Sequence, residues 1–100
     1  IDSTKVPCLT DVMDLIEMGC IPGAAFRNQE YTSDHCHFAD SVDYNHKMLL
    51  LDAQTSGGLL MSVKPKDVDE VLSDLKNAGY PFSTVVGKVE RRKDKSVFVV

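Results

Sequence analysis

The second half of the chain has the clearest pattern of apolar and polar positions. Apolar residues recur there at positions i, i+3, i+4 and i+7: Val68, Val71, Leu72 and Leu75. This spacing places them on one face of a helix. Pro65 is tolerated in a first helical turn, acidic residues follow it, and Gly79 supplies a stop. The pattern predicts an amphipathic helix between these two residues.

Runs of β-forming residues flank this helix. Strands are predicted at "GLLMSV" (58–63) and "FSTVVGKVE" (82–90), and a final strand at "SVFVV" (96–100) after the charged turn "RRKDK" (91–95). Alternating strands and helices on this scale are typical of a compact α/β unit. We therefore predict an α/β fold for the second half.

The first half of the chain predicts one short helix. Val12, Leu15 and Ile16 fall on one helical face, and Gly19 suits the position just after a helix. Thr10 is the predicted N-cap. The prediction is an amphipathic helix from about Asp11 to Met18, preceded by an extended segment over residues 1–8.

The middle of the chain has no clean periodicity. The stretch from Ile21 to Asn45 is long for a loop, so it contains short elements or is irregular for a functional reason. The next stretch, "HKMLLLDAQ" (46–54), fits a short helix and a buried strand equally well, as brief apolar runs often do.

Composition narrows the class of protein. One hundred residues suit a single domain, and 43% hydrophobic with 26% charged residues are typical of a globular protein. The net charge of -4 argues against electrostatic binding to nucleic acid or an anionic membrane. Apolar runs such as Met48–Leu51 are too short to span a bilayer, and residues 1–7 do not resemble a signal peptide.

The chain has an odd number of cysteines and no close pair, which argues against a disulfide framework; they are Cys8, Cys20 and Cys36. Reduced thiols fit the cytosol, so we predict a cytoplasmic protein. Cys8 and Cys20 stand beside apolar residues and are expected to be small buried hydrophobes. The adjacent His35, Cys36 and His37 could each bind zinc, but a structural zinc site needs four ligands and no C-x-x-C partner exists. A solvated loop without metal is the prediction.

The stretch "DAQTSGGLL" (52–60) places two hydroxyl side chains and two glycines between apolar runs. It fits a tight turn, because glycines allow positive φ angles and Thr and Ser bond locally to the backbone. It also fits an anion cradle, because amides without Cβ atoms can approach a phosphate closely. Lys47 precedes the stretch and Lys64 follows it, so it is not a P-loop.

A longer stretch, "LLLDAQTSGGLLMSV" (49–63), resembles the "L-x-D-P-Q-T-S-G-G-L-L" segment of the selenide, water dikinases, also called selenophosphate synthetases. Upstream, "GCIPGAAFRNQEY" (19–31) is similar to that family's "G-x-x-P-G-G-T-x-x-N" segment. The last predicted helix and "VVGKV" (85–89) are similar to its C-terminal helix and "V-I-G-x-V" strand. The resemblance covers nearly the whole chain, in order.

Two positions depart from the family pattern. Ala53 replaces a proline, which should loosen the turn without removing a hydrogen-bond donor. Ala24-Ala25-Phe26 stands where the family has Gly-Thr and a variable residue, so a threonine hydroxyl is absent.

The resemblance implies a fold and a reaction. The fold is α/β (α+β), with a mixed β-sheet packed against helices, as in the C-terminal domain of the aminoimidazole ribonucleotide synthetase superfamily. It implies an N-terminal domain of the same chain that binds ATP and forms a homodimer. It also implies a phosphotransferase that uses ATP, Mg²⁺, selenide and water to form selenophosphate, AMP and phosphate.

The family's catalytic groups are expected outside these residues. Its reactive Cys or Sec, its lysine, its magnesium-binding aspartates and its "D-x-T-G-F-G" segment have no counterpart in residues 1–100. Phosphoryl transfer needs metal and cations around the transferred group. We therefore expect an N-terminally truncated C-terminal fragment that is inactive alone, binds no cofactor alone and contains no catalytic residue.

The site implied by the resemblance is a substrate cleft lined by the hydroxyl-glycine loop. Its expected residues lie near the phosphates: Thr55, Ser56, Gly57, Gly58, Gln54 and Asn28. Leu49–Leu51 and Leu59–Leu60 are expected to anchor the loop in the core from both sides.

Two alternatives remain. One is a free-standing anion-binding or regulatory α/β module. The other is the C-terminal domain of a different ATP-using member of the same superfamily, acting in purine or thiamine synthesis or in hydrogenase maturation.

Overall fold

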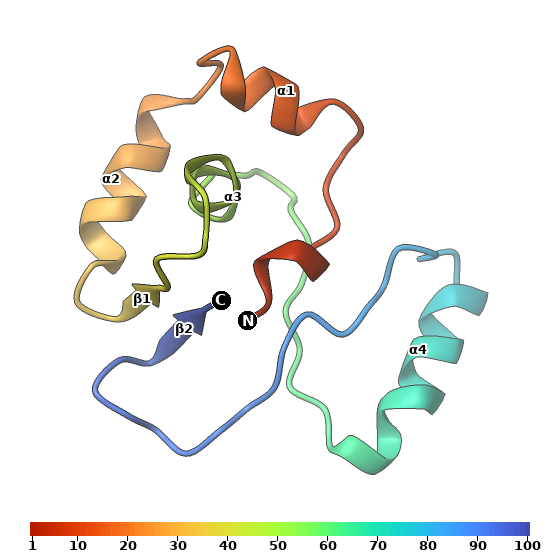
Figure 1. Ribbon diagram of the computed structural model, residues 1–100. Helices are drawn as coiled ribbons and strands as arrows, with labels where there is room; N and C mark the ends of the chain where they lie inside the picture. Colours follow the sequence, from red (N-terminus) through yellow and green to blue (C-terminus); the bar gives the residue numbers. More distant parts are fainter.

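Three helices of the first half pack together above a small two-stranded sheet, and a fourth helix lies apart from them (Figure 1). The computed structural model describes residues 1–100. The elements in chain order are η1 (Ser3–Lys5), α1 (Val12–Glu17), α2 (Gly23–Thr32), β1 (Cys36–Phe38), α3 (Tyr44–Leu50), η2 (Pro65–Asp67), α4 (Val68–Asn77) and β2 (Val97–Val99). None of the helices has the length and apolar character needed to cross a membrane.

Helices α1 and α4 end at the glycines that the sequence indicates. Gly19 has φ 85° and Gly79 has φ 95°, a left-handed conformation that glycine adopts at low cost. In each case the next amide reaches back to close the last turn, from Cys20 to the Leu15 carbonyl at 2.9 Å and from Tyr80 to the Leu75 carbonyl at 2.9 Å. Both predicted helix stops are confirmed.

The helix starts agree less well with the sequence. Helix α1 begins at Val12, and Asp11, not Thr10, occupies the N-cap position. Asp11 is left-handed, at φ 64°, and makes no side-chain cap bond, so the predicted Thr10 cap is wrong. Helix α3 has a regular cap, because the Asp43 carboxylate accepts a hydrogen bond from the His46 amide at 2.9 Å. Residues 46–50 of the ambiguous stretch are therefore helical, and residues 51–54 are not.

The stretch from 21 to 45 contains two short elements, helix α2 and strand β1. Helix α2 buries a single residue, Ala25, whose exposed fraction is 0%. One small buried side chain leaves no apolar stripe, so periodicity could not reveal this helix. The position of Ala25 in the core also shows that this residue serves packing.

The sheet joins distant parts of the chain. Strands β1 and β2 pair in parallel, with Cys36 opposite Val97 and Phe38 opposite Val99. The chain start runs beside β2, because the Ile1 ammonium donates to the Phe98 carbonyl at 2.7 Å. The two chain ends therefore lie together in the middle of Figure 1. Helices with a parallel two-stranded sheet confirm the α/β class.

Two of the predicted strands do not form. Residues 58–63 and 82–90 are not in regular strands. A strand is stabilised by hydrogen-bonded neighbours, and neither segment has a partner strand along its length. As a result Leu59 is 91% exposed and Leu60 is 72% exposed. The expectation that these leucines anchor the loop is wrong, whereas Leu51 on the other side is buried.

The core lies where α1, α2 and α3 meet. Ile16, Ala25 and Met48 form it, one residue from each helix. Val12, Met13, Ile21 and Leu49 are partly buried against this cluster. Helix α4 contributes no buried residue. The first half of the chain therefore provides the rigid support from which the loop after α3 extends.

Candidate functional site

The hydroxyl-glycine loop starts from a fixed point at the end of helix α3. Leu51 caps that helix and is 5% exposed. The Asn28 side chain on α2 donates from Nδ2 to the Leu51 carbonyl at 2.9 Å. Because an amide side chain satisfies this helix-end carbonyl, the exit direction of the chain is set. The structure thus brings Asn28 to the start of the loop.

The loop itself is exposed and keeps its donors free. Residues 53–60 are all exposed, and Ser56 has a positive φ of 56°. None of the amides from Thr55 to Gly58 donates to another backbone group, and neither hydroxyl has a hydrogen-bond partner in the protein. Four amides and two hydroxyls are therefore available to a ligand.

Gly57 allows Gln54 to fold back over the bend. A Cβ on Gly57 would lie 2.5 Å from the Gln54 Oε1 atom and 3.2 Å from its Cβ. The end of the Gln54 side chain could rotate away from a Cβ at position 57, and the Gln54 Cβ would have to shift by a few tenths of an ångström. Gly58 has nothing within 4 Å of a Cβ position. Of the two glycines, Gly57 is the one that another residue approaches closely.

The loop offers polar groups without positive charge. Residues 49–63 contain no lysine, arginine or histidine, and their one ionisable side chain is the acidic Asp52. No ion pair involves this stretch. Any anion held here would be bound by neutral donors, and its charge would have to be neutralised by groups from elsewhere.

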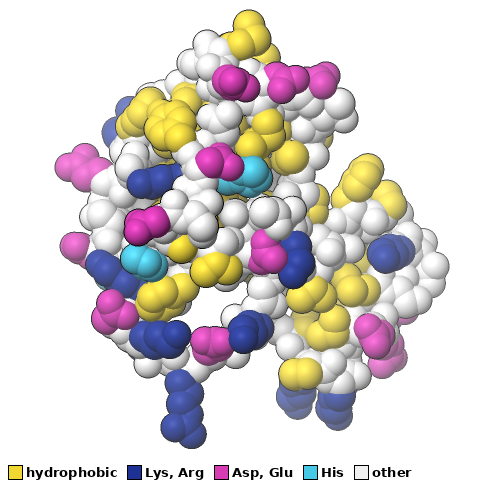
Figure 2. Space-filling model, in the orientation of Figure 1, with side chains coloured by type: hydrophobic (Ala, Val, Ile, Leu, Met, Phe, Trp, Pro, Cys, Tyr) yellow, Lys and Arg dark blue, Asp and Glu magenta, His cyan; other side chains and the backbone are white.

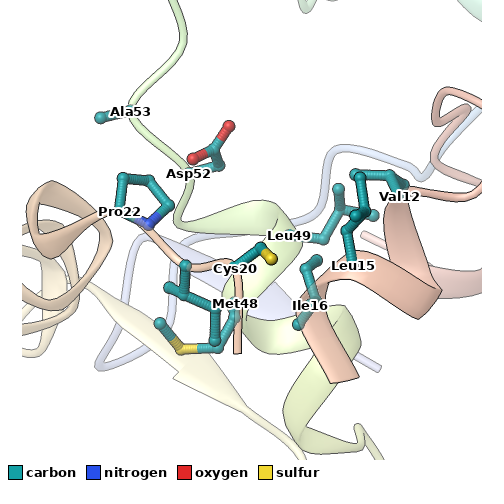
Figure 3. Close-up of a pocket in the computed structure, with 10 residues that line it drawn as sticks. Val12, Leu15, Ile16, Cys20, Pro22, Met48, Leu49, Asp52 and Ala53 are labelled. Carbon is teal, nitrogen blue, oxygen red and sulfur yellow. The ribbon is translucent and has the colours of Figure 1, made fainter. Parts of the chain in front are cut away.

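An apolar cavity of about 390 Å³ opens beside the loop start, between α1 and α3 (Figure 3). Its lining is Val12, Leu15, Ile16, Cys20, Ile21, Pro22, Met48, Leu49, Asp52 and Ala53. Asp52 is the one charged residue on this lining. The sequence did not reveal the cavity, because it depends on how α1 packs against α3. Thr55–Gly58 do not line it.

A second cavity of about 280 Å³ lies between the end of α2 and strand β1. Its lysines are already engaged: Lys95 donates to the Ser33 carbonyl at 2.9 Å, and Lys47 lies 5.4 Å from the Phe38 ring centroid. Burial raises the pKa of the Cys36 thiol, against the opposing effect of the chain-end ammonium and Lys47. A neutral, half-buried thiol is a poor nucleophile.

The other candidate residues make no site. No three or more His, Cys, Asp or Glu residues are grouped so that they could hold a metal ion. His35 and His37 are exposed and Cys36 is half-buried on β1. Cys8 and Cys20 are exposed, so their prediction as buried hydrophobes is wrong. Their apolar sequence neighbours misled the prediction because few of those neighbours are themselves buried.

Comparison with known proteins defines the class of this chain. Residues 1–100 match the family model described as AIR synthase related protein, C-terminal domain, and the chain belongs to that family. Curated proteins similar to it carry the name selenide, water dikinase. The protein of that name from Porphyromonas gingivalis strain W83 is 42% identical over 100% of this chain and 28% of its own length.

Further relatives have the same name and the same coverage. The selenide, water dikinase of Pseudomonas straminea is 40% identical over 99% of this chain and 28% of its own length. That of Agathobacter rectalis is 35% identical over 99% of this chain and 29% of its own length. The chain thus spans less than a third of the relatives it matches. No solved structure matches it.

Proposed function

We propose that this chain is the C-terminal part of a selenide, water dikinase, an enzyme that converts ATP, selenide and water into selenophosphate, AMP and phosphate. The observation that supports this most strongly is identity of 31–42% to proteins of that name along all or nearly all of the chain. The proposal includes the family's N-terminal ATP-binding domain, Mg²⁺ and a homodimer, in the cytoplasm.

Within this enzyme, we place the hydroxyl-glycine loop at the substrate cleft. Thr55, Ser56, Gly57 and Gly58 would donate hydrogen bonds to phosphate oxygens, and Gln54 would close over them. Asn28 would act indirectly, because its hydrogen bond to the Leu51 carbonyl sets where the loop begins. The support for this placement is that the loop's donors are exposed and unpaired.

The loop would complete a phosphate-binding site whose positive charge is supplied by groups outside the loop. Its residues carry no cation, and no ion pair reaches them. Phosphoryl transfer depends on metal ions and cationic side chains around the transferred group. The loop would therefore act in orienting the substrate and excluding water, while the metal and cations belong to the N-terminal domain. On this account the 100 residues alone do not convert ATP and selenide into products.

The enzyme assignment is tested with the product of the complete reading frame that contains this chain. We expect it to form AMP from ATP at a rate that depends on added selenide. Formation of ADP instead, or AMP formation that is the same without selenide, would overturn the assignment. The 100-residue chain alone is the matched control and should show neither activity.

The loop assignment is tested in that same protein with Thr55→Ala and Ser56→Ala together. Hydrogen bonds to charged groups contribute about 1.5–3 kcal/mol each, so loss of both hydroxyls should lower kcat/KM for ATP by roughly 100-fold or more. Ser73→Ala on the exposed surface of α4 is the control and should change little. If the loop variant retains full kcat/KM, the cleft placement is wrong.

A further inference from the structure

The second cavity, between the end of α2 and strand β1, contains the two lysines that are least exposed to solvent. Of the 11 Lys and Arg side chains, Lys47 and Lys95 are the two that are not exposed. Both line this cavity, although they are far apart in the sequence. Lysine is rarely withdrawn from water unless an opposite charge compensates it. Their half-burial at one place therefore indicates a role for the two charges together.

No carboxylate of the protein compensates these charges. Neither lysine forms an ion pair, and no Asp or Glu lines the cavity. Lys95 Nζ donates instead to two neutral carbonyl oxygens, that of Ser33 at 2.9 Å and that of Asp34 at 3.2 Å. Lys47 Nζ lies 5.4 Å from the centroid of the Phe38 ring. These contacts hold two positive charges in place without neutralising them.

The cavity also keeps hydrogen-bond donors free. An ammonium group has three N–H donors, so Lys95 retains one after its two carbonyl bonds and Lys47 retains all three. The carboxamide of Gln29, half-buried on the same lining, makes no hydrogen bond within the protein. The hydroxyls of Thr32 and Ser33 are different, because each donates to a carbonyl of helix α2 at 2.8 Å. The free donors thus come from the two lysines and Gln29.

The cavity is small and lies where separate elements meet. Its volume is about 280 Å³, and helices α2 and α3, strand β1 and the segment before β2 all contribute to its lining. Figure 2 shows Lys and Arg side chains, with acidic ones among them, on the part of the molecule that holds β1 and β2. Pockets for drug-sized ligands and cofactors measure about 300–1,000 Å³, so this one suits a smaller ligand.

We propose that this cavity binds a small oxyanion of the phosphate class, whose charge is met by Lys47 and Lys95 and which accepts a further hydrogen bond from Gln29. Two fixed ammonium groups suit an anion with two negative charges, and lysine is a common partner of phosphate groups. The bound anion would link helix α3 to the segment before β2. The site shares no residue with the hydroxyl-glycine loop, so it does not depend on the proposed function.

The three cysteines allow the site to be tested with internal controls. Cys36 lines the cavity, whereas Cys8 and Cys20 are exposed elsewhere. In the product of the complete reading frame, the rate at which iodoacetamide alkylates each cysteine is measured by mass spectrometry, with and without inorganic phosphate. A bound anion covers the thiol and disfavours the reactive thiolate, so phosphate should slow alkylation of Cys36 roughly threefold or more, with saturation. The rates at Cys8 and Cys20 should not change.

Lysine variants test whether the two charges are responsible. Lys47→Met keeps a long side chain beside the Phe38 ring and removes the charge, and Lys95→Met removes the other charge. Each should abolish the protection of Cys36, measured against the same variant without phosphate. Lys66→Met should keep it, because the Lys66 side chain is 78% exposed and lies outside the cavity. If Lys95→Met fails to fold, Lys47→Met alone decides, and protection that survives in it would overturn the proposal.

Two further anions distinguish binding of a small oxyanion from other effects. Sodium chloride at the same ionic strength tests general screening of charge, and it should protect Cys36 little. AMP carries a phosphate group on a nucleoside and tests whether the ligand is a nucleotide. Equal protection by chloride, protection by AMP without protection by phosphate, or no protection by any anion would each show the proposal to be wrong.

Discussion

At the scale of single residues, the first residue and Gly87 approach each other backbone to backbone. A Cβ on Gly87 would lie 2.9 Å from the Ile1 Cα and 3.3 Å from its nitrogen. Neither backbone atom can rotate away as a side chain could. The close approach keeps Ile1 between strand β2 and the 84–89 segment. Gly87 is therefore needed for packing, whereas the flexibility of a glycine is secondary here.

Gly87→Ala should consequently destabilise the chain. Overpacking of this kind costs about 1–3 kcal/mol, measured as a lower free energy of unfolding in urea. Gly58→Ala is the control, because nothing lies within 4 Å of its Cβ position. It should change the free energy of unfolding by no more than about 1 kcal/mol, in the stabilising direction. Equal losses in both variants would contradict the structure.

Asp2 gives a prediction for the dependence on pH. Hydrogen bonding by the Thr4 hydroxyl, and then by Lys5, lowers the pKa of Asp2 from its ordinary 3.8 to about 2. A pKa that is lower in the folded state means that the ionised carboxylate favours folding. This contribution is present above pH 3.8 and is lost as the pH falls to about 2.

The measurement is an NMR titration of the Asp2 side chain in the folded chain. The carboxylate should titrate near pH 2, and Thr4→Ala should move its midpoint upward, because the hydroxyl that donates at 2.6 Å is removed. A midpoint near 3.8 in the unchanged chain would show that these bonds do not form in solution.

At the scale of elements, the sequence predicted the features that depend on neighbouring residues. It did not predict those that depend on contacts between distant parts of the chain. Gly19 and Gly79 mark helix ends through their own backbone conformation, so position alone predicted them. Helix α2 depends on Ala25 fitting between α1 and α3, which no local pattern encodes. The strand pattern of 58–63 is real, but strand formation needs a neighbour that these residues lack. The sequence pattern revealed the loop, and the resemblance added Asn28 as a cleft residue, but the hydrogen bond from Asn28 to the Leu51 carbonyl was not predicted.

The three-helix core can be tested with a matched pair of methionines. Met48 is 2% exposed and Met61 is 52% exposed. Met48→Ala should cost about 2–5 kcal/mol of unfolding free energy, since it leaves a cavity between α1 and α3. Met61→Ala in the isolated chain should cost less than about 0.5 kcal/mol. Similar losses at both positions would mean that the core is placed wrongly.

At the scale of the whole molecule, the first half of the chain is packed around a core and the second half is largely exposed. Helices α1, α2 and α3 hold the core, while α4 lies at the side on two extended segments (Figure 1). The hydroxyl-glycine loop stands at the junction, where α3 leads into the first of those segments.

The placement of the loop at the substrate is tested most directly by its amides. In the product of the complete reading frame, a nonhydrolysable ATP analogue with Mg²⁺ should shift the ¹⁵N–¹H signals of Thr55, Ser56, Gly57 and Gly58. The signal of Ser73, on the exposed surface of α4, should stay in place. If the analogue binds and shifts signals elsewhere while those four remain unmoved, the loop does not meet the substrate and the account is wrong.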